Sequence, residues 1–143
     1  YFVPDRRFRA ALARAARPGV NVRVLLPAKS DQPLAQWASH VLARPLARRG
    51  VQFFAYQPRM LHAKVTLIDT AWGMVGSANA DYRSFFINRE LNIISRDPRV
   101  CVQLAALLTD DMDQAQPLEM STPGRLSLRE WSESLARRLR RLL

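Results

Sequence analysis

The chain has 143 residues, of which 48% are hydrophobic and 24% are charged. This length and composition fit one folded domain with its own core, and they exclude a disordered or low-complexity chain. No apolar run approaches the roughly 20 residues that cross a bilayer, so the sequence contains no transmembrane helix pattern.

The cysteine content indicates the redox compartment of the protein, and the net charge indicates the class of its binding partners. The single cysteine, Cys101, excludes an internal disulfide and fits a reducing compartment. The net charge of +10 favours an anionic partner such as nucleic acid, phospholipid headgroups or a phosphorylated metabolite. The codon bias of a GC-rich genome would also produce twenty arginines against two lysines, so the charge by itself does not choose among these partners.

Apolar periodicity and Pro/Gly breakers divide the chain into strand and helix segments. The predicted elements, in chain order, are a strand at 1–3, a helix at 5–17, a strand at 20–27, a helix at 32–49, strands at 51–56, 61–68, 72–77 and 90–95, and a helix from 98 to about 112. Pro45 introduces a kink or a break in the second helix. Strands that alternate with helices and then follow one another predict an α/β sandwich with a mixed β-sheet flanked by helices.

The C-terminal part differs in character from the rest. We expect a domain at 1–115, a linker at 116–126 and a basic amphipathic helix at 127–143. In that helix a capping box precedes leucines and Trp131 on one face, with arginines largely opposite. Such a helix lies on an anionic bilayer surface or docks on its own domain, and the sequence leaves both open.

A mostly apolar segment at 60–79, MLHAKVTLIDTAWGMVGSAN, carries the polar residues of interest. Side chains two residues apart in a strand share a face, so His62 and Lys64 project together while Ala63 points into the core. Asp69 falls at the strand end with the opposite parity. We expect it to support the site rather than to touch a substrate.

The next strand repeats this arrangement, because Ser77 and Asn79 also share a face and Gly76 lets the backbone approach closely. Lys64 and Asn79 would hold the non-bridging oxygens of a phosphate, and His62 would act on phosphorus or on the leaving oxygen. The usual carboxylate cluster for Mg²⁺ or Zn²⁺ is missing, so we expect neither a metal nor another cofactor. The competing interpretation is a core histidine with satisfied hydrogen bonds beside a solvated lysine.

These residues carry a family resemblance. HAKVTLID (62–69) followed by GSAN (76–79) resembles the HKD motif of the phospholipase D superfamily. Three further stretches resemble its bacterial cardiolipin synthase branch: NADYRSFFINRELN (79–92), YFVPD (1–5) and LLPAKSDQPL (25–34). The resemblance covers about residues 1–115 and implies one half of a phospholipase D-like α/β sandwich.

The resemblance implies a mechanism that needs two HKD motifs, from two halves of one chain or from two identical subunits. One histidine attacks phosphorus to give a phosphohistidine, and the other protonates the leaving alcohol and then deprotonates the incoming one. The pattern assigns this acid and base role to His62, the orientation of a histidine to Glu90, and the motif aspartate to Asp69. The matched phosphate-binding positions are Lys64, Ser77 and Asn79.

The sequence departs from this pattern because it holds a single HKD motif. The other histidine, His40, has Leu42 where the motif needs a lysine. Because the chain starts YFVPD without a methionine, we expect the first motif in an upstream half. The alternative is a C2 dimer in which two copies of His62 divide the roles. A lone monomer of this chain would be inactive.

Four residues that follow the motif keep two interpretations each. Arg83 and Ser84 either meet a lipid phosphate or cap a helix or loop. Phe85 and Phe86 either line an acyl-chain path or pack in the core, and packing is the interpretation that we favour.

The function favoured by these features is a phosphatidyltransferase that makes cardiolipin from phosphatidylglycerol at a membrane surface. We expect a peripheral protein on the cytoplasmic side of the bacterial inner membrane. One alternative is a phospholipase D-like nuclease or phosphodiesterase working as a single-motif dimer, although the synthase-like context makes nucleic acid the less favoured partner. The other is an inactive module that binds anionic membranes.

Overall fold

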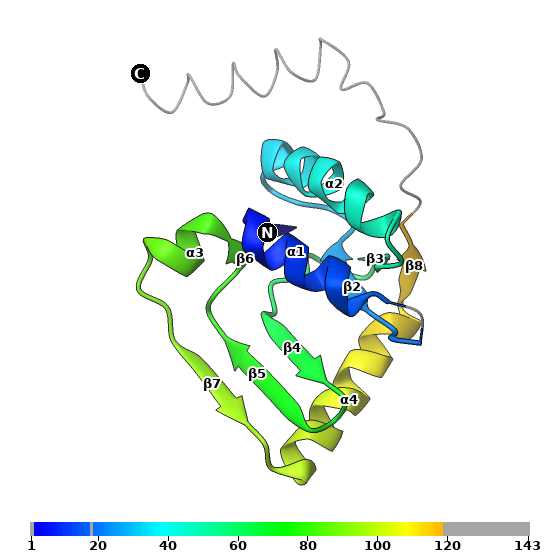
Figure 1. Ribbon diagram of the computed structural model, residues 1–143, viewed down its shortest axis with the longest axis vertical. Helices are drawn as coiled ribbons and strands as arrows, with labels where there is room; N and C mark the ends of the chain where they lie inside the picture. The colour runs from blue at the N-terminus through cyan, green and yellow to red at the C-terminus, as the bar shows by residue number, and fades with distance from the viewer. Residues whose placement is uncertain (1, 18, 119–143) are drawn as a thin grey trace.

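Strands and helices are interleaved along the chain in the computed structural model, which describes residues 2–17 and 19–118 (Figure 1). The helices are α1 (Arg6–Ala15), α2 (Pro33–Ala47), α3 (Tyr82–Phe86) and α4 (Pro98–Asp113). The strands are β1 (Phe2–Val3), β2 (Arg23–Pro27), β3 (Gln52–Tyr56), β4 (Val65–Ile68), β5 (Trp72–Gly76), β6 (Ala80–Asp81), β7 (Asn92–Ser95) and β8 (Ala115–Pro117).

The strands form three ladders. β1 pairs in parallel with β6, and β2 pairs in parallel with β3, whose other edge binds β8 antiparallel. β4, β5 and β7 form an antiparallel sheet in that order. The predicted α/β class, with parallel and antiparallel pairing and helices alongside, is confirmed. The strands are distributed over three sheets rather than the one expected.

The main hydrophobic core lies where α2 packs on β1 and β3. Its buried members are Phe2, Leu26, Ala43, Leu46, Val51 and Phe53. The rings of Phe2 and Phe53 meet edge to face, with centroids 5.7 Å apart and planes at 71°. Pro45 lies inside α2 between buried Ala43 and Leu46, and it does not end the helix.

A second packing layer forms where α4 lies against the β4–β5 hairpin. Cys101 is completely buried there. Leu104 lies so close to Gly73 that a Cβ on that residue would stand 2.6 Å from Leu104 Cδ1. This contact holds the hairpin that follows His62 and Lys64 against a long helix.

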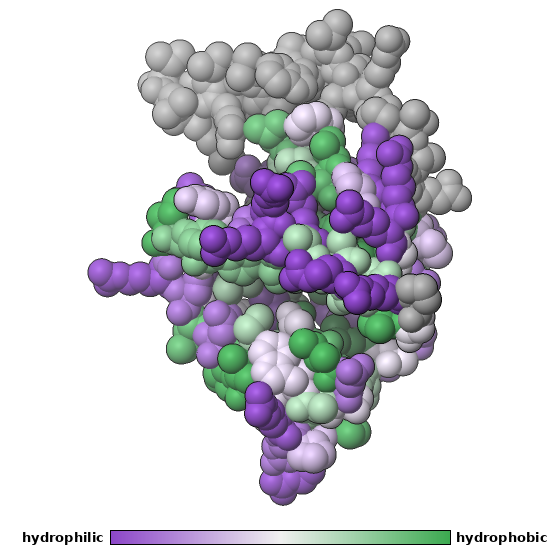
Figure 2. Space-filling view, in the orientation of Figure 1, coloured by the Kyte–Doolittle hydropathy of each residue, from purple (hydrophilic) through white to green (hydrophobic). Residues whose placement is uncertain are grey.

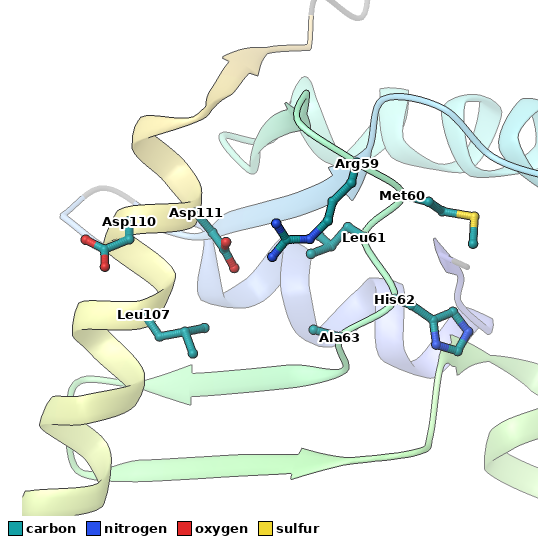
Figure 3. Close-up of a pocket in the computed structure, with 8 residues that line it drawn as sticks. All are labelled: Arg59, Met60, Leu61, His62, Ala63, Leu107, Asp110 and Asp111. Carbon is teal, nitrogen blue, oxygen red and sulfur yellow. The ribbon is translucent and has the colours of Figure 1, made fainter.

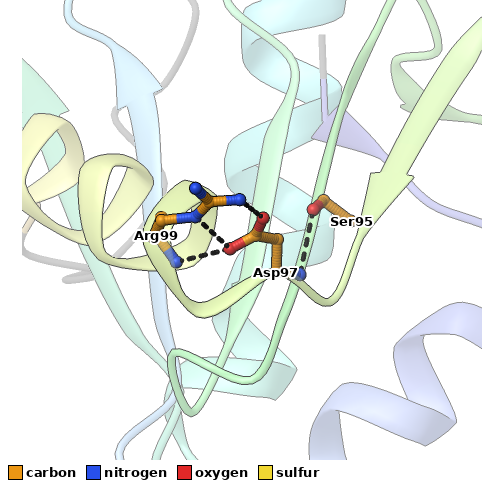
Figure 4. A network of polar contacts seen from close by, with 3 residues as sticks. All are labelled: Ser95, Asp97 and Arg99. Atoms are coloured by element: carbon orange, nitrogen blue, oxygen red, sulfur yellow. Dashed lines mark hydrogen bonds and ion pairs between the residues drawn. The ribbon is translucent and has the colours of Figure 1, made fainter.

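The start of α4 is fixed by the side chain of Asp97. Its carboxylate accepts the backbone N–H of Arg99 at 2.9 Å and pairs with the Arg99 guanidinium at 2.8 Å (Figure 4). The hydroxyl of Ser95 accepts the N–H of Asp97 at 3.1 Å. The helix Pro98–Asp113 agrees with the prediction to within one residue.

The strand expected at 61–68 is shorter, because β4 starts at Val65 and residues 61–64 are irregular. Gly76, the last residue of β5, donates its N–H to the carbonyl of Lys64 at 3.1 Å. The ladder ends at that bond, and Ala63, expected in the core, is exposed. The strand expected at 90–95 likewise begins only at Asn92, which leaves Glu90 in the preceding loop.

The folded part of the chain continues past the expected domain limit of 115. Ala115–Pro117 pairs with β3, so strand β8 includes residues that were expected in a linker. Residues 119–126 of that linker and the helix expected at 127–143 lie outside the described residues. Among helices within 2–17 and 19–118, none has the length and apolar character needed to cross a membrane.

Candidate functional site

Lys64 directly precedes β4, and its side chain folds back toward the irregular segment 61–64. Nζ donates a 2.8 Å hydrogen bond to the backbone carbonyl of His62, which ties the two motif residues together. Burial lowers the pKa of Lys64, while the carboxylates of Glu90 and Asp81 act in the opposite direction. The ammonium is therefore partly desolvated and lies within reach of two negative charges.

Ser77, directly after β5, is bonded to Glu90, thirteen residues further along the chain. Its hydroxyl donates to a Glu90 carboxylate oxygen at 2.5 Å and accepts the N–H of Leu91 at 3.0 Å. The pKa of Glu90 is lowered, first by the Ser77 hydroxyl and next by the Ser84 hydroxyl. Asn88 adds a 3.3 Å bond to the other carboxylate oxygen. These bonds favour the ionised form of Glu90.

Asn79 is held by a hydroxyl that the sequence did not single out for this purpose. Its backbone N–H donates to Ser84 Oγ at 3.1 Å, and the N–H of Ser84 donates to Asp81, the N-cap of α3, at 2.8 Å. Ser84 is only 8% exposed. The spacing of Asp81 and Ser84 signals the helix cap, but the contact with Asn79 depends on the fold.

Gly76 allows the strand that leads into the site to approach β7 closely. A Cβ at this position would collide with the Asn92 side chain and the Leu91 carbonyl, and would lie 2.7 Å from Asn92 Cα. The close approach lets Asn92 Oδ1 accept the N–H of Ala78 at 3.4 Å. The expected role of Gly76 in backbone approach therefore matches the geometry.

His62, Lys64 and Asn79 all line one open cavity of about 770 Å³ between the β4–β5 hairpin and strand β2. His62 is exposed, and in the described part of the chain its imidazole has no hydrogen-bond partner. The interpretation as a buried core histidine is therefore wrong. The exposed ring remains accessible to a substrate.

His62 also borders a second cavity, of about 640 Å³, that reaches α4 (Figure 3). The guanidinium of Arg59 extends toward Asp111 in this view, whereas the His62 ring points away from α4. In the described residues, no group of three or more His, Cys, Asp or Glu side chains is placed to hold a metal ion.

Asp69 lies in the turn between β4 and β5. It and Thr70 have φ values of 49° and 50°, and the N–H of Ala71 donates to the Ile68 carbonyl at 3.0 Å, as in a type I′ turn. Strand β4 separates Asp69 from Lys64 by about 16 Å at a rise of about 3.3 Å per residue. The structure thus brings Lys64, Ser77 and Glu90 together and places Asp69 at the far end of the hairpin, where it still lines the same cavity as His62 and Lys64.

This site is suited to a phosphodiester. An ammonium and a backbone-anchored asparagine border the same cavity as an exposed imidazole, and an ionised carboxylate lies beside them. Ammonium and amide groups bind phosphate oxygens, and an accessible imidazole exchanges protons or attacks phosphorus. The α/β framework is that of a phospholipase D-like domain, the class to which the family model assigns residues 1–114.

Comparisons with known proteins agree with the assignment to the phospholipase D-like class. The chain belongs to the family described as "Cardiolipin synthase, PLD-like domain", whose sequence model matches residues 1–114. It is 39% identical to cardiolipin synthase A of Pseudomonas putida strain W619 over 143 residues, all of this chain and 29% of that protein. It is 42% identical to cardiolipin synthase A of Pseudomonas entomophila over 118 residues, 82% of this chain and 25% of that protein.

A solved structure supports the fold. The crystal structure of Nuc, a phospholipase D family member from Salmonella typhimurium, matches with a TM-score of 0.71 and 20% identity. The match covers 83% of this chain and 78% of Nuc. The chain spans less than a third of the length of the two cardiolipin synthases described above.

Proposed function

We propose that this chain supplies the second HKD half-site of a phospholipase D-type phosphatidyltransferase that makes cardiolipin from phosphatidylglycerol. The observation that carries the proposal is the exposed imidazole of His62 in one cavity with Lys64 and Asn79, beside the Ser77–Glu90 pair. The relatives named cardiolipin synthase A support the choice of lipid over other phosphodiesters.

In the proposed reaction the histidine of the other motif attacks the phosphorus of phosphatidylglycerol. The new P–N bond forms as the bond between phosphorus and the oxygen of the headgroup glycerol breaks. His62 gives that leaving oxygen a proton. His62 then takes a proton from the headgroup hydroxyl of a second phosphatidylglycerol. That oxygen attacks phosphorus and breaks the P–N bond, which yields cardiolipin and glycerol.

Lys64 and Asn79 hold the non-bridging oxygens in this proposal, as the motif pattern predicts. Ser77 has a single hydroxyl proton, and this proton lies in the bond to Glu90. Ser77 therefore acts first by positioning Glu90, and binds phosphate directly only when that bond opens. Glu90 orients a histidine, and Asp69 stabilises the hairpin that carries Lys64.

The proposed site is complete only with a second HKD motif, from an upstream half or from a second copy of this chain. Anionic phospholipid is the proposed substrate, and the proposed location is the cytoplasmic face of the bacterial inner membrane. The surplus of arginine is compatible with an anionic lipid surface.

The test begins with the gene sequence upstream of Tyr1, where a second His-x-Lys-x4-Asp would identify the missing half. The protein expressed from the complete gene is then incubated with phosphatidylglycerol and, separately, with DNA, in the presence of EDTA. Cardiolipin formation that disappears in a His62→Gln variant supports the proposal. Cleavage of DNA without turnover of lipid would replace it with a nuclease, and loss of neither activity in His62→Gln would refute the site.

A further inference from the structure

Four aromatic rings gather on the surface beside the site, and we call them the aromatic cluster: Phe8 of α1 and Tyr82, Phe85 and Phe86 of α3. The centroids of Phe8 and Phe85 are 5.4 Å apart, and those of Tyr82 and Phe86 are 4.8 Å apart. The rings of Phe85 and Phe86 meet edge to face at 6.3 Å. These contacts make one continuous apolar surface.

The aromatic cluster is exposed rather than packed in the core. Tyr82 is 58% exposed and Phe86 59%, and the neighbouring Ile87 is 63% exposed. Phe86 therefore packs against Tyr82 and Phe85 at the surface, and not in the core. Figure 2 shows hydrophobic residues at the position of α3 with hydrophilic residues beside them. An exposed group of large apolar side chains with a polar rim marks an interaction surface.

The charge around the aromatic cluster is positive. The segments 2–16 and 79–94 contain six arginines against three carboxylates, Asp5, Asp81 and Glu90. Asp5 and Asp81 accept bonds from backbone N–H groups as helix N-caps, and Glu90 is bonded to Ser77. The carboxylates are thus engaged locally while Arg6, Arg7, Arg83 and Arg89 are exposed.

The aromatic cluster is also continuous with the phosphate-binding segment. Tyr82 follows Asn79 by three residues, and the hydroxyl of Ser84 on α3 holds the Asn79 backbone. α3 therefore contacts the site through one residue and presents aromatic rings to solvent through others. In a bilayer, a lipid phosphate lies at the same depth where arginine and aromatic side chains are preferred.

We propose that the aromatic cluster docks on an anionic bilayer, so that the site faces the headgroups of the membrane from which it takes its lipid. This inference rests on the proposed function, because it assigns the substrate to a membrane. The flanking arginines supply attraction to anionic headgroups, and the rings enter the interfacial region. The competing occupant is the second HKD half of the protein.

The test uses the protein expressed from its complete gene, carrying Tyr82→Ser and Phe86→Ser together. The matched control is Val102→Ser on α4, which removes a side chain that is also 59% exposed. Binding is measured by sedimentation with vesicles of phosphatidylcholine, with and without phosphatidylglycerol. Turnover is measured with vesicles and with dispersed dihexanoyl phosphatidylglycerol, and the elution volume reports assembly.

We expect the double variant to bind phosphatidylglycerol vesicles at least about tenfold more weakly and to turn them over correspondingly more slowly. Its turnover of dispersed short-chain lipid and its elution volume should match the wild type, as should all properties of Val102→Ser.

Unchanged vesicle binding of the double variant, or equal binding of the wild type to both vesicle types, would overturn the inference. Altered assembly with loss of short-chain turnover would instead place the second half on the aromatic cluster. Cluster-dependent binding without any lipid turnover by the wild type would uphold the docking surface and refute the proposed function.

Discussion

The hydroxyl of Ser77 donates a 2.5 Å hydrogen bond to the carboxylate of Glu90. The same oxygen accepts the N–H of Leu91 at 3.0 Å, so one hydroxyl joins the end of β5 to the loop before β7. This crosslink lies next to the ammonium of Lys64, whose pKa responds to Glu90. The position and the protonation of Glu90 therefore depend on Ser77, the residue that follows β5.

Ser77→Ala should lower the turnover of phosphatidylglycerol by about 10- to 100-fold, because it frees the Glu90 carboxylate. The Ser77 hydroxyl is the main cause that lowers the pKa of Glu90 from its ordinary value of 4.5. Ionised Glu90 is lost as the pH falls through its pKa, so the acidic limb of the pH–rate profile should move to higher pH in the variant. Ser95→Ala, which removes a hydroxyl on β7 that accepts the backbone N–H of Asp97, should change neither quantity. An unshifted acidic limb in Ser77→Ala would contradict this assignment.

Ser84→Ala should destabilise the fold and slow the reaction together. The substitution leaves the Asn79 N–H without its partner in a partly buried place, which costs about 1–2 kcal/mol in the free energy of unfolding. Ser95→Ala is the matched control, since Ser95 also accepts a backbone N–H at 3.1 Å but lies at the end of β7 that leads into α4. Urea titrations should give similar losses for both variants, whereas initial rates should fall only for Ser84→Ala. Equal initial rates in the two variants would show that Ser84 does not position the site.

The sequence was sufficient to predict the fold class and to single out His62, Lys64 and Asn79. Periodicity and motif spacing are local, and these residues lie within 18 positions of one another. Strand limits were less accurate, because β4 begins at Val65, where its antiparallel partner β5 ends, and not where its apolar pattern begins. The role of Ser84 and the exposure of Phe86 depend on what the rest of the chain covers, which no local pattern contains.

Gly76→Ala should be strongly destabilising. Its new Cβ would meet backbone atoms of Leu91 and Asn92, which move only if β7 shifts. The expected loss is about 2–3 kcal/mol, with a parallel loss of activity because Glu90 precedes β7. Gly73→Ala also creates a close contact, at 2.6 Å, but with the end of the Leu104 side chain, which can rotate. Its cost should be nearer 1 kcal/mol. Equal melting temperatures of the two variants would refute the argument.

Lys64→Met should abolish most of the activity without destabilising the protein. Loss of one charged donor to a phosphate typically lowers the rate by about 10²- to 10³-fold. Burial lowers the pKa of Lys64, so its charged form is disfavoured by folding at every pH below that pKa. This unfavourable contribution disappears as the pH rises toward 10.5, the ordinary value. Thermal unfolding near neutral pH should therefore show an unchanged or slightly higher melting temperature, and a clear decrease would count against the desolvated ammonium.

Substitutions in the β4–β5 turn can distinguish a structural role of Asp69 from a catalytic one. Asp69 and Thr70 both have positive φ, which aspartate tolerates better than β-branched threonine, and Asp-Gly is a preferred pair for a type I′ turn. Thr70→Gly should therefore stabilise the fold by about 0.5–1 kcal/mol.

Asp69→Asn keeps a residue that accepts positive φ but removes the charge, so turnover should stay within about threefold of the wild type. Asp69→Val should instead lower the melting temperature, because valine disfavours that backbone conformation. A loss of turnover in Asp69→Asn comparable to that in Lys64→Met, at unchanged stability, would show that the carboxylate takes part in the chemistry despite its distance along the hairpin.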